Sequence, residues 1–177
     1  MLLAEVSVSA FLFREGSTTY ALLDAAKEKS IPKLLESSGG TYASLYVGTE
    51  ARDLASVAPY LVPLSPDSQL LKTLMSDGWG KAWGVFLQSA AGFEKTRQHL
   101  RAQLLTQTPS GHQLYFRYYD PRVLRAFMRV SNGAELRELF GPITHFIVEG
   151  EDPKTAIRFS PGANGVAEEK VQLKQPG

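Results

Sequence analysis

Short apolar runs and amphipathic stretches follow one another along most of the chain, and their spacings predict strands and helices in alternation. The pattern predicts strands at residues 5–13, 20–23, 42–47, 60–64, 83–87, 114–119, 145–149 and 155–159. It predicts helices that begin at Ile31 and after Ser65-Pro66-Asp67, and others over residues 49–57, 92–106, 121–129 and 134–140. We therefore predict an α/β fold: a mixed β-sheet with short helices between strands, in a single compact domain.

The pattern changes near both ends of the sequence. Residues 1–19 form an N-terminal extension that is predicted to add one strand, and residues 20–160 hold the α/β domain. From residue 161 the sequence is rich in Gly, Pro and Gln, so residues 161–177 are predicted to be a flexible tail. Within the domain, Leu54 and Val57 are expected to face the core, and Pro63 indicates a sheet edge or a strand end.

Composition removes several classes of protein. The 177 residues carry 19 Lys and Arg against 18 Asp and Glu, a net charge of +1, which gives no broad attraction to nucleic acid or to an acidic membrane. The absence of cysteine excludes disulfide scaffolds, thiol nucleophiles and cysteine-ligated metals. Neither a secretory signal nor a membrane span is predicted, because the N-terminal segment lacks a basic stretch and no apolar run is long enough. We expect a cytoplasmic protein.

A search for catalytic and cofactor motifs finds none that is complete. The glycines around Gly80 lack the spacing of a phosphate-binding loop, and no G-x-S-x-G elbow is present. The three histidines, His99, His112 and His145, have no second ligand at zinc-site spacing. We therefore predict no cofactor, no metal and no enzymatic activity. A small α/β enzyme that uses aspartates at element ends, such as Asp24, stays open as an alternative.

The helix that follows Asp120 is the most informative segment. Asp120 and Pro121 are the residue types that begin a helix, as its cap and its first residue, and we assign them a structural role. Arg122, Arg125 and Arg129 then fall on one side of the helix and the apolar residues on the other. Such a stripe is either a solvated face or a surface that binds a partner, and we take these three arginines as candidate partner contacts. Nucleic-acid binding through the stripe is a further alternative.

Two tryptophans occur close together in the sequence Gly-Trp-Gly-x-x-Trp-Gly. Both can anchor the core where a helix joins a strand, or one can be an exposed contact for a partner. We assign Trp83, like Asp24 at the end of its strand, to a structural role. Trp79 is the candidate partner contact.

Taken in order, several motifs resemble one protein family. They are Tyr20-Ala21-Leu22-Leu23-Asp24-Ala25-Ala26, Ser44-Leu45-Tyr46-x-Gly48-Thr49, Ala58-Pro59-Tyr60-Leu61-Val62, Gly78-Trp79-Gly80-x-x-Trp83-Gly84-Val85-Phe86-Leu87, Leu100-Arg101, Phe116-Arg117-Tyr118-Tyr119-Asp120-Pro121-Arg122-Val123-Leu124 and Leu139-Phe140-Gly141-Pro142. This series, from Tyr20 to about Glu149, resembles the bacterial domain of unknown function 4123.

The resemblance implies a function that the residues alone do not. The family is similar to adaptor chaperones of the type VI secretion system, which implies that this chain binds a toxic effector protein in the cytoplasm. It also implies that the chain helps to load the effector onto the VgrG spike and is not itself an enzyme. The implied partners are therefore the effector and the VgrG spike protein. Some members carry a forkhead-associated domain that is not found here, so phosphopeptide binding is not implied.

Overall fold

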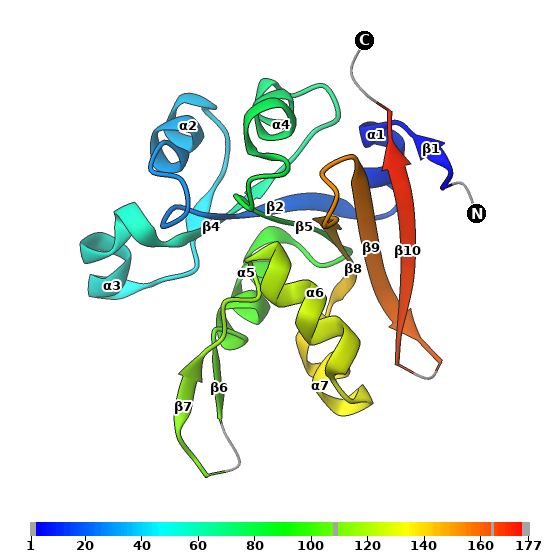
Figure 1. The fold of residues 1–177 in the computed structure, drawn as a ribbon. Coiled ribbons are helices and arrows are strands. Elements are labelled where there is room, and N and C mark those ends of the chain that lie inside the picture. Colours follow the sequence, from blue (N-terminus) through cyan, green and yellow to red (C-terminus); the bar gives the residue numbers. More distant parts are fainter. Residues whose placement is uncertain (1–2, 108–109, 164, 175–177) are drawn as a thin grey trace.

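The described residues of this computed structural model, 3–107, 110–163 and 165–174, form one large sheet and one small one (Figure 1). The large sheet has eight strands in the order β1-β10-β9-β8-β5-β2-β4-β3, and its neighbours are antiparallel except for the parallel pair β1 and β10. Its strands are β1 (Glu5–Val6), β2 (Thr18–Asp24), β3 (Ala43–Ser44), β4 (Pro59–Pro63), β5 (Gly84–Ser89), β8 (Ile143–Glu149), β9 (Thr155–Gly162) and β10 (Gly165–Leu173). A separate hairpin pairs β6 (Leu105–Gln107) with β7 (Gln113–Tyr115).

Helices cover both faces of the large sheet. They are α1 (Val8–Leu12), α2 (Ile31–Ser37), α3 (Gly48–Asp53), α4 (Gln69–Thr73), α5 (Phe93–Ala102), α6 (Pro121–Val130) and α7 (Gly133–Phe140), with a 3-10 turn at Ala55–Val57 and a π-helical turn at Leu74–Gly78. Figure 1 shows α2 and α4 on one face and α5, α6 and α7 on the other. The predicted α/β fold with a mixed sheet is confirmed.

The central strands bury both of their faces, each in its own core. In β2, Tyr20 and Leu22 belong to the core under α5, α6 and α7, whereas Ala21 and Leu23 belong to the core under α2 and α4. The same alternation divides β5, β8 and β9 between the two cores. Because side chains alternate along a strand, a continuous apolar run is what a strand covered on both faces requires. This explains why the central strands could be predicted from their apolar sequences.

One glycine lets the two central strands approach each other closely. A Cβ atom built on Gly84, the first residue of β5, would lie 2.2 Å from the carbonyl oxygen of Leu22 in β2. A separation that short is a steric overlap with backbone that is fixed by the sheet. Glycine is therefore the residue that fits here.

The predicted strand at residues 5–13 is wrong beyond its first residues. Only Glu5–Val6 pair with β10, and Val8–Leu12 form α1 instead. Ser7 begins this helix, because its side chain accepts a hydrogen bond from the backbone N–H of Ala10 at 3.2 Å. Phe11 and Leu12 are adjacent and both are buried in the same core. A strand would have placed them on opposite faces, so the helix is the better solution. Met1 and Leu2 lie outside the described residues.

The predicted flexible tail at residues 161–177 is also wrong, because most of it is strand β10. This strand pairs with β9 from Gly165 to Gln172 and buries Val171 and Leu173 in the core under α2 and α4. Its Glu169 accepts a hydrogen bond from the buried Arg158 of β9 at 2.6 Å. The polar composition of β10 reflects one exposed face and not a lack of structure. Residues 175–177, which the tail prediction included, lie outside the described residues.

Three predictions in the middle of the chain need smaller corrections. The strand predicted at 42–47 pairs only at Ala43–Ser44, and the helix predicted at 49–57 ends at Asp53. Leu54, which follows α3, and Val57, in the 3-10 turn, are 43% and 41% exposed and do not face the core. Pro63 stands at the end of β4, opposite Tyr20, which is one of the two positions predicted for it.

The region around the hairpin was also predicted only in part. The helix predicted at 92–106 ends at Ala102, and the strand predicted at 114–119 ends at Tyr115. Tyr118 and Tyr119 are consecutive and both buried in one core. An alternating strand in a two-stranded hairpin cannot bury two neighbours on the same side. The chain therefore leaves the hairpin after Tyr115 and turns toward α6.

Candidate partner-binding surface

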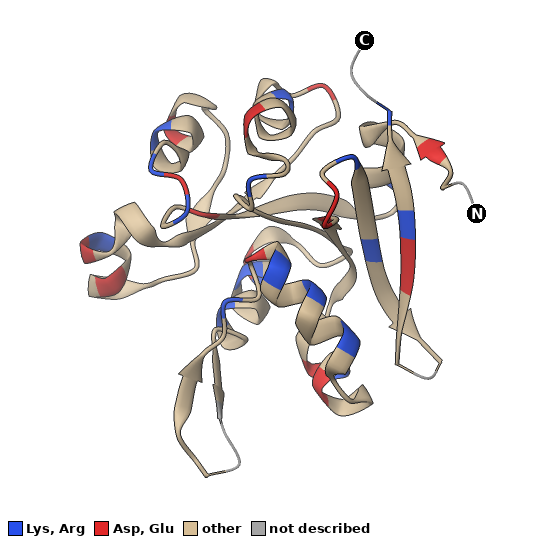
Figure 2. Ribbon diagram, viewed as in Figure 1, with Lys and Arg blue, Asp and Glu red and all other residues tan. Residues whose placement is uncertain are grey.

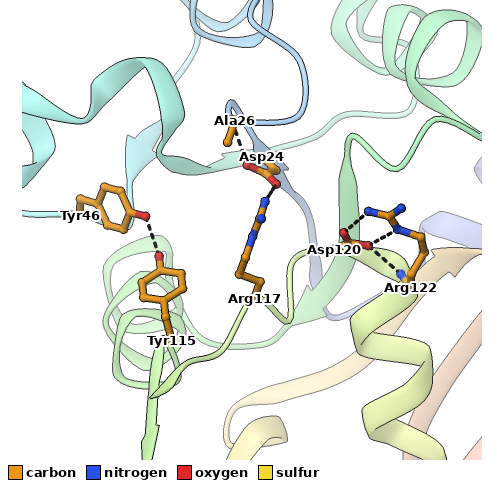
Figure 3. A network of polar contacts seen from close by, with 7 residues as sticks. All are labelled: Asp24, Ala26, Tyr46, Tyr115, Arg117, Asp120 and Arg122. Atoms are coloured by element: carbon orange, nitrogen blue, oxygen red, sulfur yellow. Dashed lines mark hydrogen bonds and ion pairs between the residues drawn. The ribbon is translucent and has the colours of Figure 1, made fainter. Parts of the chain in front are cut away.

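Segments that are far apart in sequence meet where β2 ends. Asp24, the last residue of β2, has 2% of its side chain exposed. Its carboxylate accepts hydrogen bonds from the backbone N–H of Ala26 at 3.0 Å and from the Arg117 guanidinium at 2.5 Å (Figure 3). Burial disfavours the charge on Arg117, but the bond to Asp24 outweighs it and raises the pKa of the guanidinium. These contacts fix the segment that leads into α6 against the end of β2.

Asp120 and Pro121 begin α6 in the way that their residue types predict. One oxygen of Asp120 accepts from the backbone N–H of Arg122 at 2.9 Å and from its Nε at 3.0 Å (Figure 3). The other oxygen accepts from Nη2 of the same arginine at 2.6 Å. Asp120 is thus the N-cap of the helix and Pro121 its first residue. The cap also holds the Arg122 side chain, which is 60% exposed, in one orientation.

Basic positions follow one another along α6 (Figure 2), but the side chains of its three arginines do not form one exposed stripe. Arg125 is only 9% exposed, and it donates from Nη1 to the backbone carbonyl of Glu149 at 2.7 Å. Arg129, at the far end of α6, forms ion pairs with Glu168 of β10 at 3.0 Å and with Glu151 at 3.6 Å. The arginine side of α6 was predicted to face away from the core. This is wrong for Arg125, because its side chain lies against the end of β8. Arg122 and Arg129 stay accessible.

Glu149 forms hydrogen bonds with the backbone of the loop that carries both tryptophans. Its carboxylate accepts hydrogen bonds from the backbone N–H groups of Gly80 at 2.6 Å and Ala82 at 3.0 Å. Burial raises the pKa of Glu149, and these hydrogen bonds and the charge of Arg125 oppose that rise. Both N–H groups lie where the backbone takes positive φ angles, 81° at Gly80 and 57° at Ala82. The hydrogen bonds to Glu149 therefore stabilise an unusual loop conformation.

Trp79 and Trp83 are each half-buried against the core under α2 and α4. The Trp79 ring lies 5.9 Å from the Phe86 ring, and its indole N–H donates to the Pro153 carbonyl at 2.7 Å. The Trp83 ring occupies the space beside Gly78, where a Cβ would come within 2.6 Å of it. The structure thus gives both tryptophans packing contacts, and it leaves part of Trp79 accessible to a partner.

An open hollow of about 300 Å³ lies between this loop and the start of α6. Its basic lining residues are Lys27, Lys81, Arg122 and Arg125, and its acidic ones are Glu149 and Glu151. The accessible cations at its rim can bind carboxylates of a partner protein. The carboxylate of Glu149 already accepts hydrogen bonds from the backbone of the loop. Of the predicted contacts, Arg122 and Arg125 line this hollow, whereas Trp79 and Arg129 do not.

The hairpin β6–β7 is a surface feature that the sequence analysis missed. It exposes three large apolar residues: Leu105 at 55%, Leu114 at 51% and Tyr115 at 44%. The Tyr115 hydroxyl donates to that of Tyr46 at 2.7 Å, which fixes the base of the hairpin to the body of the protein (Figure 3). The signal in the sequence was the turn Pro109-Ser110-Gly111 between two short segments that carry the apolar residues Leu105 and Leu114.

We expect the stability that Asp120 contributes to depend on pH. Burial disfavours its charge, but hydrogen bonds and charge from Arg122, and the charge of Arg117, lower its pKa below the ordinary 3.8. A lowered pKa gives stability above the unfolded-state value that is lost as the pH falls through the folded-state value. Asp120→Asn keeps a cap but not the charge. The stability gap between wild type and Asp120→Asn should be widest above pH 3.8 and should close at lower pH.

Urea unfolding at a series of values between about pH 6 and pH 2 measures this gap. Asp53→Asn is a matched control, because that side chain is 68% exposed on α3 and forms only a 3.5 Å contact with Arg52. A gap for Asp120→Asn that stays constant across the series would show that the charge of Asp120 adds nothing to stability.

Neither a metal site nor a membrane span is found in the described part of the chain. Within residues 3–107, 110–163 and 165–174, no three His, Asp or Glu side chains are grouped so that they could hold a metal ion. His99 bonds to the Leu139 carbonyl at 2.8 Å, and His145 to the Thr144 hydroxyl at 3.0 Å. No helix among the same residues has the length and apolar character to cross a bilayer.

Comparison with known proteins gives one match. A family model with the description "Domain of unknown function (DUF4123)" matches residues 19–138, more than half of the chain. The match begins one residue inside β2, contains β5, the hairpin β6–β7 and α6, and ends within α7, just before the last motif of the resemblance. No curated protein and no solved structure gives a significant match.

Proposed function

Because the chain belongs to the DUF4123 family, we propose that it is an adaptor chaperone of type VI secretion. In this proposal it binds a cognate effector protein in the bacterial cytoplasm and helps to load that effector onto the VgrG spike. The observation that carries the proposal is the family match over residues 19–138, which supports the resemblance of the ordered motifs. The protein acts by binding and not by catalysis, so we expect no turnover of a substrate.

The surface of the matched region supports a binding role. Large apolar residues are exposed on the hairpin, and α6 exposes Val130 at 83% and Val123 at 37% beside its accessible arginines. Apolar side chains mixed with arginine are typical of surfaces that contact other proteins. We propose Arg122, Arg129 and Trp79 as contacts for the effector or the spike. Arg125 is left out of this set because its side chain is buried.

The proposal is tested by co-expression. The tagged chain is produced together with its cognate effector and VgrG protein, and the complex is washed at moderate salt. We expect the effector to be retained in stoichiometric amount, with or without VgrG. An effector from an unrelated gene cluster, expressed in the same way, is the matched control. If the cognate effector is produced and remains soluble but washes away like the control, the adaptor proposal is wrong.

A further inference from the structure

A groove of about 630 Å³ lies between the hairpin β6–β7 and the helices α6 and α7. In Figure 1 the hairpin extends away from the large sheet on the same side as these two helices. The groove is lined from the hairpin side by Gln103, Leu105, Thr106, Gln113 and Phe116, and from the helices by Phe127, Glu135, Glu138 and Leu139. It is separate from the hollow beside Arg122.

The floor and one wall of this groove are apolar. The rings of Phe116 and Phe127 pack with their centres 4.7 Å apart, and both are only partly buried against the core. Leu139, which is 1% exposed, closes the floor, and Leu105 stands on the wall with 55% of its surface exposed. A partner that places apolar side chains here would remove this surface from water, which is favourable at roughly 25 cal/mol per Å².

The charge of the groove has one sign. Its charged lining residues are Glu135 and Glu138 of α7, and no Lys or Arg is among the lining residues of the described chain. Glu135 is used in part by the cap of α7, where it accepts from the Asn132 N–H at 2.9 Å. Glu138 is exposed, and no cation of the described residues lies within ion-pair distance of it. The arginines of α6, by contrast, each have an anionic or carbonyl partner.

We propose that this groove binds a basic amphipathic helix of the partner protein. Glu135 and Glu138 are three residues apart, so they form a row along one side of α7, next to the apolar floor. A helix lying alongside α7 can present Lys or Arg to this row and apolar side chains to Phe116, Phe127 and Leu105. The inference deepens the proposed function and rests on it for the identity of the partner, since it assigns the segment of the effector that is held.

The groove is tested first with a defined probe. A fluorescent peptide of about 18 residues, built from Leu and Lys in the pattern of an amphipathic helix, is compared with its Leu and Glu counterpart by fluorescence anisotropy. Wild type should bind the Leu/Lys peptide at least about tenfold more tightly than the Leu/Glu peptide. Glu138→Lys should remove this preference, because it leaves Glu135 and Lys to offset each other in the groove. Failure of the Leu/Lys peptide to bind wild type would overturn the inference.

Matched variants separate the groove from general charge effects. Glu36→Lys makes the same charge change on an exposed helix residue of α2, on the opposite face of the sheet, and should leave peptide binding unchanged. Leu105→Ser should weaken binding, whereas Leu54→Ser, at a similarly exposed leucine beside α3, should not. Equal effects of Glu138→Lys and Glu36→Lys would also overturn the inference.

The co-expressed effector then distinguishes this inference from the proposed function. If the effector is retained by wild type and by Glu36→Lys but lost by Glu138→Lys, both hold. If both variants retain the effector equally, the adaptor function is supported, but the groove is not the site that binds the effector. Loss of the effector even from wild type, with the peptide still bound in a way that depends on Glu138, would reject the adaptor function and keep the groove.

Discussion

Gly84→Ala is expected to destabilise the protein by about 3 kcal/mol or more and to lower its yield of folded material. The added Cβ would lie 2.2 Å from the Leu22 carbonyl oxygen and 2.9 Å from the Leu23 Cα, both in the neighbouring strand β2. These are backbone atoms of the central strand pair, which also separates the two cores, so neither strand can move without disturbing both cores. Thermal and urea unfolding measure the loss.

Gly92→Ala is the matched control for this prediction. Gly92 precedes α5 with φ of −65°, and a Cβ there meets no atom within 4 Å. The same methyl group is thus added without steric overlap or backbone strain, and the change in stability should stay within about 1 kcal/mol. If the two variants unfold at the same denaturant concentration, the close approach of β2 and β5 does not depend on Gly84.

Arg125→Ala is expected to lower the free energy of unfolding by about 2–4 kcal/mol. This is a large loss for a charged residue on a helix that has one face in solvent. It takes away the donor to the Glu149 carbonyl and the cation that offsets the buried Glu149 carboxylate. The pKa of that carboxyl is already raised above 4.5 by burial, so losing Arg125 raises it further. The loss of stability should be largest at pH values where Glu149 is charged and should shrink as acid protonates it.

Arg129→Ala on the same helix is the control. Its ion pairs with Glu168 and Glu151 are at the surface, where such pairs contribute about 1 kcal/mol or less. Urea unfolding of both variants at two pH values makes the comparison. Equal and small losses would mean that Arg125 is as dispensable as a surface residue. Because Arg129→Ala should remain folded, it is also the variant in which loss of the effector can be attributed to a lost contact.

The sequence predicted best those elements whose pattern is determined by local geometry. The central strands around Leu22 and Phe86 are apolar on both faces. A short, continuous apolar segment of this kind is typical of a strand that is buried on both sides. The start of α6 was predicted to the residue, because the Asp120 cap and Pro121 act within one helical turn. In both cases the information needed lies within a few neighbouring residues.

The elements that were missed depend on distant partners. Strand β10 has a polar sequence, and it becomes a strand because β9 supplies its hydrogen bonds and Arg158 pairs with its Glu169. The helical wheel placed Arg122, Arg125 and Arg129 correctly on one side of α6. It could not reveal that the carbonyl of Glu149 lies next to the middle one. The groove is likewise formed by a hairpin and two helices that no local pattern brings together.

The parallel pairing of β1 with β10 has a consequence for how the chain folds during synthesis. Glu5 pairs with Gln172 and Val6 with Leu173, a contact between the first and the last strands of the described chain. A ribosome releases β1 long before any residue of β10 exists, so the earliest strand must wait unpaired while the rest of the sheet assembles. Bringing the ends of so long a loop together costs less conformational entropy when the intervening residues are ordered first. The β1–β10 edge of the eight-stranded sheet can therefore form only after all the other strands of the sheet have been synthesised.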